Sequence, residues 1–408
     1  MNKIRAVDLF AGCGGLCEGF EMEGHYNTLA CVEWEKAPCE NLKKHLADKW
    51  KIKDADKRVL RFDIQRTDEL FGGWDDDDYG KNDGLDAIIG NEPIDIIIGG
   101  PPCQAYSIAG RVRDEHGMKN DYRNFLFESY VEVVKRYKPK AFVFENVPGI
   151  LSAAPTGAPI IKIIQKTFDE AGYVVLSDLA NAKIEFSEYG VPQNRSRIII
   201  LGLRKKIFGK NAQHILDEFY TKTLTKYKVK KKCTVREAIS NLPKLMPADE
   251  YKVDGKRYSH SFEEHEVKNH EPRWHSQRDQ GLFRLLGEDI ESGTNQYTSI
   301  QSLKKLYTDI TGHESNVHKY HVIRWDEPSN LIPAHLYKDG LRHIHPDPKQ
   351  ARSITVREAA RLQGFPDDYE FFGTQADAYK MIGNAVPPVF SKILAKAIFK
   401  QLFEKEGR

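Results

Sequence analysis

The sequence has few cysteines for its length and no Cys-x-x-Cys pair. Its 408 residues contain six cysteines, at positions 13, 17, 31, 39, 103 and 233. A zinc knuckle needs closely spaced cysteine pairs, and a disulfide framework needs a dense set of cysteines in a short chain. We therefore expect reduced thiols and no bound metal.

Long apolar runs are also missing. No stretch approaches the roughly 20 consecutive apolar residues of a membrane-spanning helix. The first residues, MNKIRAVDLFAGCGG, contain no apolar segment ahead of a small-residue cleavage site. We therefore expect a cytoplasmic protein, and a content of 40% apolar residues is enough for a sizeable core in two or three domains.

The net charge is only +2, but it is unevenly distributed. Residues 204–342 hold 25 Lys and Arg against 19 Asp and Glu, a difference of +6. Six lysines lie between Lys222 and Lys232 with no acid among them. A basic segment of this kind can face a phosphate backbone, and it can equally be a solvated surface run.

Short β-branched runs alternate with helical patterns over the first half of the chain. This alternation predicts an α/β fold with a doubly wound, mostly parallel sheet and helices on both faces. Past Arg204 the rhythm breaks, so we expect residues 1–204 and about 367–408 to form one domain and about 205–366 a second, smaller domain. The predicted strands are 5–10, 28–34, 59–64, 94–98, 141–146, 173–180 and 196–203.

Three local patterns lie outside this rhythm. The run Asp75–Asp78 between glycines predicts a solvated loop. The pentapeptide TVREA occurs twice, at 234–238 and 355–359, and both copies predict a helix that starts with a capping box. Four histidines, His260, His265, His270 and His275, follow one another at steps of five. That spacing spreads them around a helix, which disfavours a metal site and favours scattered surface or groove contacts.

A glycine turn follows the first predicted strand in Asp8-Leu-Phe-Ala-Gly-Cys-Gly-Gly-Leu16, and Glu33 ends the second strand. Such glycines let a ligand approach the backbone, and an acid about 20 residues later can accept hydrogen bonds from ribose hydroxyls. The spacing of Gly12, Gly14 and Gly15 departs from a dinucleotide fingerprint. It is neutral about a nucleoside cofactor without a pyrophosphate, and a plain tight turn would have the same sequence.

Polar side chains of complementary chemistry follow three later strands. The segment GGPPCQAYS holds Cys103 behind two prolines, which exclude both a helix and a paired strand. Glu145 ends the fifth predicted strand, while Arg195 and Arg197 lead into the last one. A thiol, a carboxyl and two guanidiniums in one crevice would provide a nucleophile, an acid/base partner and clamps for an anion or a carbonyl.

Seven segments resemble, in order and spacing, the motif series of the cytosine-5 DNA methyltransferases of restriction-modification systems. They are DLFAGCGG, GGPPCQAYSIAG, DYRNFLF, FENV, QNRSR, residues 352–366 and GNAVPP at 383–388. The resemblance implies methyl transfer from S-adenosyl-L-methionine to carbon 5 of a cytosine flipped out of a specific duplex sequence. No metal takes part.

The same resemblance assigns roles to single residues. The Cys103 thiolate would add to carbon 6, Glu145 would hydrogen-bond ring nitrogen 3 and the exocyclic amine, and Arg195 with Arg197 would hold the base and its phosphodiester. Residues 107–120 resemble a loop that closes over the flipped base. The implied cofactor contacts are Phe10, Gly12, Gly14, Glu33, Trp34, Asp63, Ile64, Pro102, Leu126, Asn384 and Val386.

The resemblance further implies that residues 204–342 belong to a target-recognition domain for double-stranded DNA. It suggests a monomer in the bacterial cytoplasm that acts on the nucleoid and has a cognate restriction endonuclease. A tRNA cytosine-5 methyltransferase of the same fold is the alternative, although no Cys-Phe-Thr signature is present. A binding-only regulator would not need Cys103, Glu145 and Arg195, and a nicotinamide oxidoreductase would need a dinucleotide fingerprint.

Overall fold

The computed structural model describes residues 3–102, 126–154, 157–261, 266–314, 320–338 and 340–404. The chain divides into two compact units. Unit 1 comprises Met1–Gly190, Arg195–Lys230 and Ala385–Arg408, and unit 2 comprises Val191–Asn194 and Lys231–Asn384. Apart from Val191–Asn194, unit 2 runs from Lys231 to Asn384, and the second domain expected from the sequence spans about 205–366.

The core of unit 1 is an eight-stranded, mostly parallel sheet, which confirms the predicted α/β class. Its order is β3-β2-β1-β6-β7-β10-β8, with β9 also paired to β10. The first five strands in this order are parallel, and β10 is antiparallel to β7, β8 and β9. The strands are β1 (Ile4–Leu9), β2 (Tyr26–Glu33), β3 (Val59–Arg61), β6 (Ile96–Gly99), β7 (Ala141–Asn146), β8 (Tyr173–Val174), β9 (Lys183–Glu185) and β10 (Ser196–Arg204).

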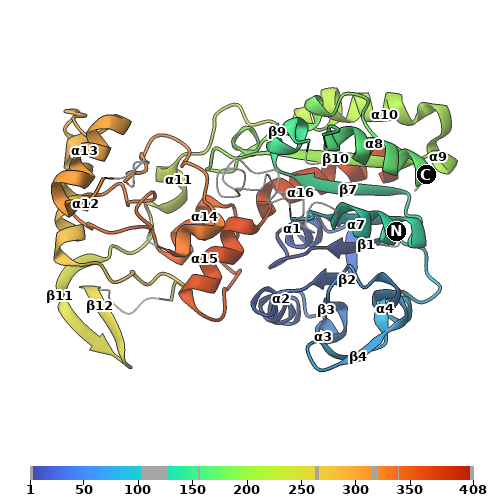
Figure 1. The fold of residues 1–408 in the computed structure, drawn as a ribbon, viewed down its shortest axis with the longest axis horizontal. Helices are drawn as coiled ribbons and strands as arrows, with labels where there is room; N and C mark the ends of the chain where they lie inside the picture. The colour runs from blue at the N-terminus through green and yellow to red at the C-terminus, as the bar shows by residue number, and fades with distance from the viewer. Residues whose placement is uncertain are drawn as a thin grey trace. The chain divides into compact units, whose positions relative to one another are not determined.

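The two ends of the chain pack together in unit 1, where helices α1 and α16 lie side by side (Figure 1). A Cβ at Gly19 would lie 2.2 Å from the Cβ of Ser391, so the two helices approach without a side chain between them. The hydroxyl of Tyr26 donates to the carbonyl of Ala395 at 2.9 Å. The principal helices of unit 1 are α1 (Gly15–Glu23), α2 (Lys36–Asp48), α7 (Leu126–Tyr137), α8 (Ile160–Glu170), α10 (Ala212–Glu218) and α16 (Pro388–Ile398).

Two local expectations in unit 1 are wrong. The acidic run at 75–78 is part of a hairpin, β4 (Trp74–Asp76) and β5 (Gly80–Asn82), in which Asp76 accepts the N–H of Tyr79 at 2.7 Å and pairs with Arg66 at 2.6 Å. The strand expected over 173–180 is only two residues long, because a 3-10 helix at Leu179–Ala182 follows it.

Unit 2 is built from short helices and a hairpin. Both TVREA copies start a helix with a complete capping box, as predicted, at α11 (Val235–Ile239) and α14 (Val356–Leu362). None of the helices that the structure describes is long and apolar enough to cross a membrane. The other elements are β11 (Met246–Val253), β12 (Lys256–Ser261), α12 (Gln277–Glu291), α13 (Ile300–Thr311) and α15 (Gln375–Asn384).

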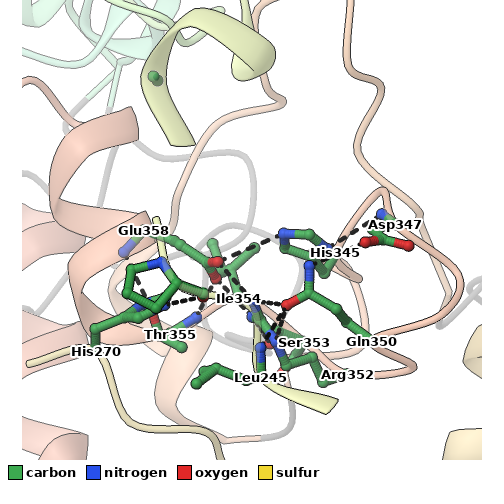
Figure 2. A network of polar contacts seen from close by, with 12 residues as sticks. Leu245, His270, His345, Asp347, Gln350, Arg352, Ser353, Ile354, Thr355 and Glu358 are labelled. Carbon is green, nitrogen blue, oxygen red and sulfur yellow. Dashed lines mark hydrogen bonds and ion pairs between the residues drawn. The ribbon is translucent and has the colours of Figure 1, made fainter. Parts of the chain in front are cut away.

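A buried polar network lies within unit 2 (Figure 2). The guanidinium of Arg352 donates twice to the carboxylate of Glu358, each time at 2.7 Å, and both side chains are about 1% exposed. Gln350 accepts further hydrogen bonds from Arg352, and the ring of His345 lies 3.5 Å from Glu358. Because Glu358 also closes the capping box of α14, this network fixes the helix that carries the late sequence motif.

The expected surface role of the histidines spaced at five is wrong for the three that the structure describes. His260 and His270 are fully buried and His275 is 6% exposed. The ring of His260 bonds the carbonyl of Gln350 at 2.8 Å, and burial lowers the pKa of His260 to about 4. Within the described ranges no cluster of His, Cys, Asp and Glu could hold a metal ion.

Candidate active site

The strand order of unit 1 creates a crevice at the carboxyl ends of β1 and β6. Strand β1 pairs with β2 on one side and with β6 on the other. The chain runs from β1 to β2 and β3, then crosses to β6 and β7, so the loops after β1 and β6 diverge. Open α/β sheets bind their ligands at such a switch point.

The glycine turn after β1 has an unusual backbone. Phe10, Gly12 and Gly14 have φ values of +57°, +56° and +82°, in the left-handed region that glycine adopts at no steric cost. A side chain at Gly14 would also meet Leu42 at 2.5 Å. The turn is therefore tight and places the Phe10 ring at the crevice, where it lines the cavity described below.

Asp8 accepts the hydrogen bond that a capping side chain would accept at the start of α1. Gly14, the N-cap of α1, has no side chain, and the carboxylate of Asp8 accepts the N–H of Cys17 at 3.2 Å instead. Asp8 is fully buried, and burial raises its pKa well above the usual range of a carboxyl group. Asp8 begins the first motif, yet no local pattern around it indicates this capping role.

Glu33 holds three backbone N–H groups. Its Oε2 accepts from Gly12 at 2.8 Å, and its Oε1 accepts from Trp34 and Glu35 at 2.9 Å each. Burial raises the pKa of Glu33, and these N–H groups act in the opposite direction. A carboxylate oxygen has two lone pairs, so Oε2 can accept one further hydrogen bond, for example from a sugar hydroxyl.

A cavity lies against these residues at the carboxyl ends of β1, β2 and β3. Seven of the predicted cofactor contacts line it together with three residues that sequence analysis missed. Each missed residue is adjacent in sequence to a predicted one, and Phe62 stacks on Trp74 with ring centroids 3.9 Å apart. The lining comprises Phe10, Glu33, Trp34, Asp63, Ile64, Pro102 and Leu126, and the missed Val32, Phe62 and Gln65.

Four other predicted cofactor contacts have different surroundings. Gly12 and Gly14 shape the turn, and the carbonyl of Val386 lies 2.3 Å from the position of a Cβ on Gly15. Gly12, Gly14 and Val386 do not line the cavity. Asn384 is exposed and is the last residue of unit 2.

The segment after β6 is joined to the end of β7. A Cβ at Gly100 would lie 2.6 Å from Oε2 of Glu145, so a larger residue there would displace this carboxylate. The side-chain amide of Asn146 donates to the carbonyl of Pro101 at 3.3 Å. Pro102 lines the cavity. Gly100, Pro101 and Pro102 thus connect the end of β7 with the cavity. Cys103 is the next residue in the sequence.

Glu145 and Arg197 form an ion pair from neighbouring antiparallel strands. The Arg197 Nε lies 2.8 Å from Oε1 of Glu145, and the two side chains are 11% and 13% exposed. Arg195 is 2% exposed, and burial lowers its pKa well below the usual range, an effect that the cation of Arg197 increases and Glu145 opposes. The structure therefore brings together the predicted carboxyl and both predicted guanidiniums.

The predicted nucleophile, Cys103, lies outside the described residues. The same is true of residues 107–120, the segment predicted to close over a base.

The sheet, its switch-point cavity and the acid–guanidinium cluster define the class of this protein as an α/β enzyme with its site at the carboxyl ends of the parallel strands. Residues 4–400 match the family described as C-5 cytosine-specific DNA methylase. The chain belongs to this family, and its enzymatic class is DNA cytosine-5 methyltransferase.

Curated relatives match over nearly the whole chain. The type II methyltransferase M.Bpa9945I of Bacillus paralicheniformis is 34% identical over 96% of this chain and 98% of its own length. M1.HphI of Haemophilus parahaemolyticus is 31% identical over 98% and 87%.

Solved structures share the fold at lower identity. A protein assigned as a DNA modification methyltransferase, encoded within an E. coli prophage, has a TM-score of 0.64 at 21% identity and covers 98% of this chain and 100% of its own. The Dnmt2 methyltransferase of S. pombe has a TM-score of 0.54 at 14% identity over 98% and 100%.

Proposed function

We propose that this protein transfers a methyl group from S-adenosyl-L-methionine to carbon 5 of a cytosine flipped out of a specific duplex, as the modification enzyme of a type II restriction-modification system. The observation that supports it best is the segment Gly100–Pro102. Gly100 lies against Glu145, and Pro102 lines the cavity walled by Phe10, Trp34 and Phe62. Cys103 is the next residue in the sequence.

The cavity has the chemistry that an adenosine group needs. Phe10, Trp34 and Phe62 provide aromatic walls, and Glu33 retains one lone pair of Oε2 for a ribose hydroxyl. When bound, S-adenosyl-L-methionine supplies an activated methyl group. The chain itself holds the adenosine and orients it through the glycine turn, whose Gly12 N–H is fixed by Glu33.

The cluster at β7 and β10 would act on the base. The Cys103 thiolate adds to carbon 6 of the ring, which makes carbon 5 nucleophilic, and after methylation carbon 5 loses its proton and the Cys103–carbon 6 bond breaks. Glu145 bonds ring nitrogen 3 and the exocyclic amine. Arg197 orients Glu145, and Arg195 and Arg197 hold the base and its phosphodiester.

Double-stranded DNA is the expected substrate, and unit 2 is the expected target-recognition part. Flipping a base costs a few kcal/mol, which the contacts around Cys103 and Glu145 would offset. The named relatives are type II methyltransferases, which favours a cognate endonuclease for the same site. The protein would act as a monomer.

Labelled S-adenosyl-L-methionine and duplex DNA test this function. The expected product is 5-methylcytosine in one short sequence, located by bisulfite sequencing. Cys103→Ser should abolish transfer, whereas the control Cys233→Ser, at a half-buried thiol in unit 2, should leave the rate unchanged. Transfer by Cys103→Ser would refute the assigned nucleophile, and methylation of tRNA in place of DNA would refute the substrate.

A further inference from the structure

Glu185 accepts hydrogen bonds from the residues at the start of β10, where Arg195 and Arg197 lie. The motif series that the chain resembles gives Glu185 no role. Glu185 ends β9 and lies opposite Ser196 in the antiparallel pairing with β10. Its Oε1 accepts the backbone N–H of Arg195 at 2.9 Å, and its Oε2 accepts the hydroxyl of Ser196 at 2.5 Å. One carboxylate thus binds two consecutive residues at the start of β10.

Phe186, the residue after Glu185, binds the other main-chain group of Arg195. We call the contacts of Glu185 and Phe186 with Arg195 and Ser196 the anchor. The N–H of Phe186 donates to the carbonyl of Arg195 at 2.9 Å, and the hydroxyl of Ser187 donates to Oε1 of Glu185 at 3.3 Å. Both main-chain groups of Arg195 are therefore held by Glu185 and Phe186. The backbone of Arg195 is fixed by partners that do not involve its guanidinium.

Strand geometry separates this anchor from the catalytic cluster. Successive side chains of a strand point to opposite faces, so Ser196 faces away from its two arginine neighbours. Glu185 bonds Ser196 on one face, while Arg197 bonds Glu145 on the other.

A fixed backbone at Arg195 keeps two like charges close together at the start of β10. Arg195 is 2% exposed and lies in the field of the second cation, Arg197, which disfavours its charged form. Without a fixed backbone, repulsion and solvation would draw the two guanidiniums apart and toward water. We infer that Glu185 is a positioning residue that holds Arg195 and Arg197 toward Glu145. This inference rests on the proposed function for its effect on the reaction.

Three variants test the inference by single-turnover methyl transfer at saturating DNA and cofactor. Glu185→Leu should reduce the rate about 100-fold, the effect of a misplacement near 1 Å. Glu185→Gln keeps an acceptor oxygen for the Arg195 N–H and should restore the rate to within about tenfold of the wild type. The control Glu188→Leu loses only an ion pair with Lys228 and should change the rate less than about twofold.

Two further measurements separate positioning from general damage. Cofactor affinity should stay within about twofold in Glu185→Leu, because the cavity is lined from the loops after β1, β2, β3 and β6 and the start of α7. Amide exchange at Arg195 should rise at least about tenfold, while exchange at β7 stays unchanged. This exchange result tests the anchor whatever reaction the site performs.

The outcomes decide the question. A folded Glu185→Leu protein with a rate within threefold of wild type, or with unchanged exchange at Arg195, overturns the inference. If Glu185→Leu does not fold, Ser196→Ala, which removes only the Oε2 contact, replaces it, and an unchanged rate and exchange there overturn the inference. A wild-type protein that methylates no DNA refutes the proposed function alone, since the exchange experiment still tests the anchor.

Discussion

Replacing Gly100 by alanine places a methyl group against the carboxylate of Glu145. The new Cβ would lie 2.6 Å from Oε2, whereas ordinary contact begins at 3.4 Å, so one group has to move by 0.8 Å (3.4 − 2.6). Gly100 is held between β6 and Pro101, whose carbonyl is bound by Asn146. We therefore expect Glu145 to move.

The displacement has a calculable effect on the reaction. The 2.8 Å contact between Glu145 and Arg197 is close to the optimum for an N–H···O bond, and a shift of 0.8 Å exceeds the range over which such a bond persists. A misplacement near 1 Å at a reacting group costs about 100-fold in rate. Gly100→Ala should therefore lower the single-turnover rate about 100-fold, while stability changes little because the displaced atom is the end of a flexible side chain.

The control for this variant is Gly72→Ala. Gly72 ends α4 (Thr67–Gly72) in the same unit, and a Cβ there meets nothing within 4 Å. Its rate should equal that of the wild type in the same labelled-methyl assay, and thermal unfolding should show both variants folded. A Gly100→Ala rate within threefold of Gly72→Ala would refute the steric argument.

Three other predictions concern the cofactor site and unit 2. Glu33→Ala removes the acceptor of three N–H groups and should weaken S-adenosyl-L-methionine binding at least about tenfold by calorimetric titration, with the exposed Glu40→Ala unchanged. Glu358→Gln leaves the Arg352 charge buried and should cost about 3–5 kcal/mol in urea unfolding, and a loss below 1 kcal/mol would contradict this. Burial lowers the pKa of His275 to about 3 in the folded state, from 6.5. The unfolded chain therefore binds the proton first, and stability should fall as the pH drops from 6.5 toward 3, by up to about 1.4 kcal/mol per pH unit. A His275→Gln variant that keeps the full slope would contradict this assignment.

Features that depend on neighbours along the chain could be predicted from the sequence. The capping boxes at Thr234 and Thr355 were predictable because their partners lie three residues away. Most strands of unit 1 were predictable because parallel strands buried on both faces are continuous apolar runs. Cavity residues such as Glu33 and Asp63 were predictable because ligand groups gather at strand ends in a doubly wound sheet.

Contacts between residues far apart in the chain became visible in the folded structure alone. Phe62 enters the cavity wall with Trp74 stacked behind it, and Glu185 anchors Arg195 through a hairpin-like pairing of β9 with β10. His260 is polar, yet it is buried because the carbonyl of Gln350, 90 residues away, accepts its hydrogen bond. Burial and pKa depend on what packs around a group from elsewhere in the chain, and no local pattern of residues encodes that environment.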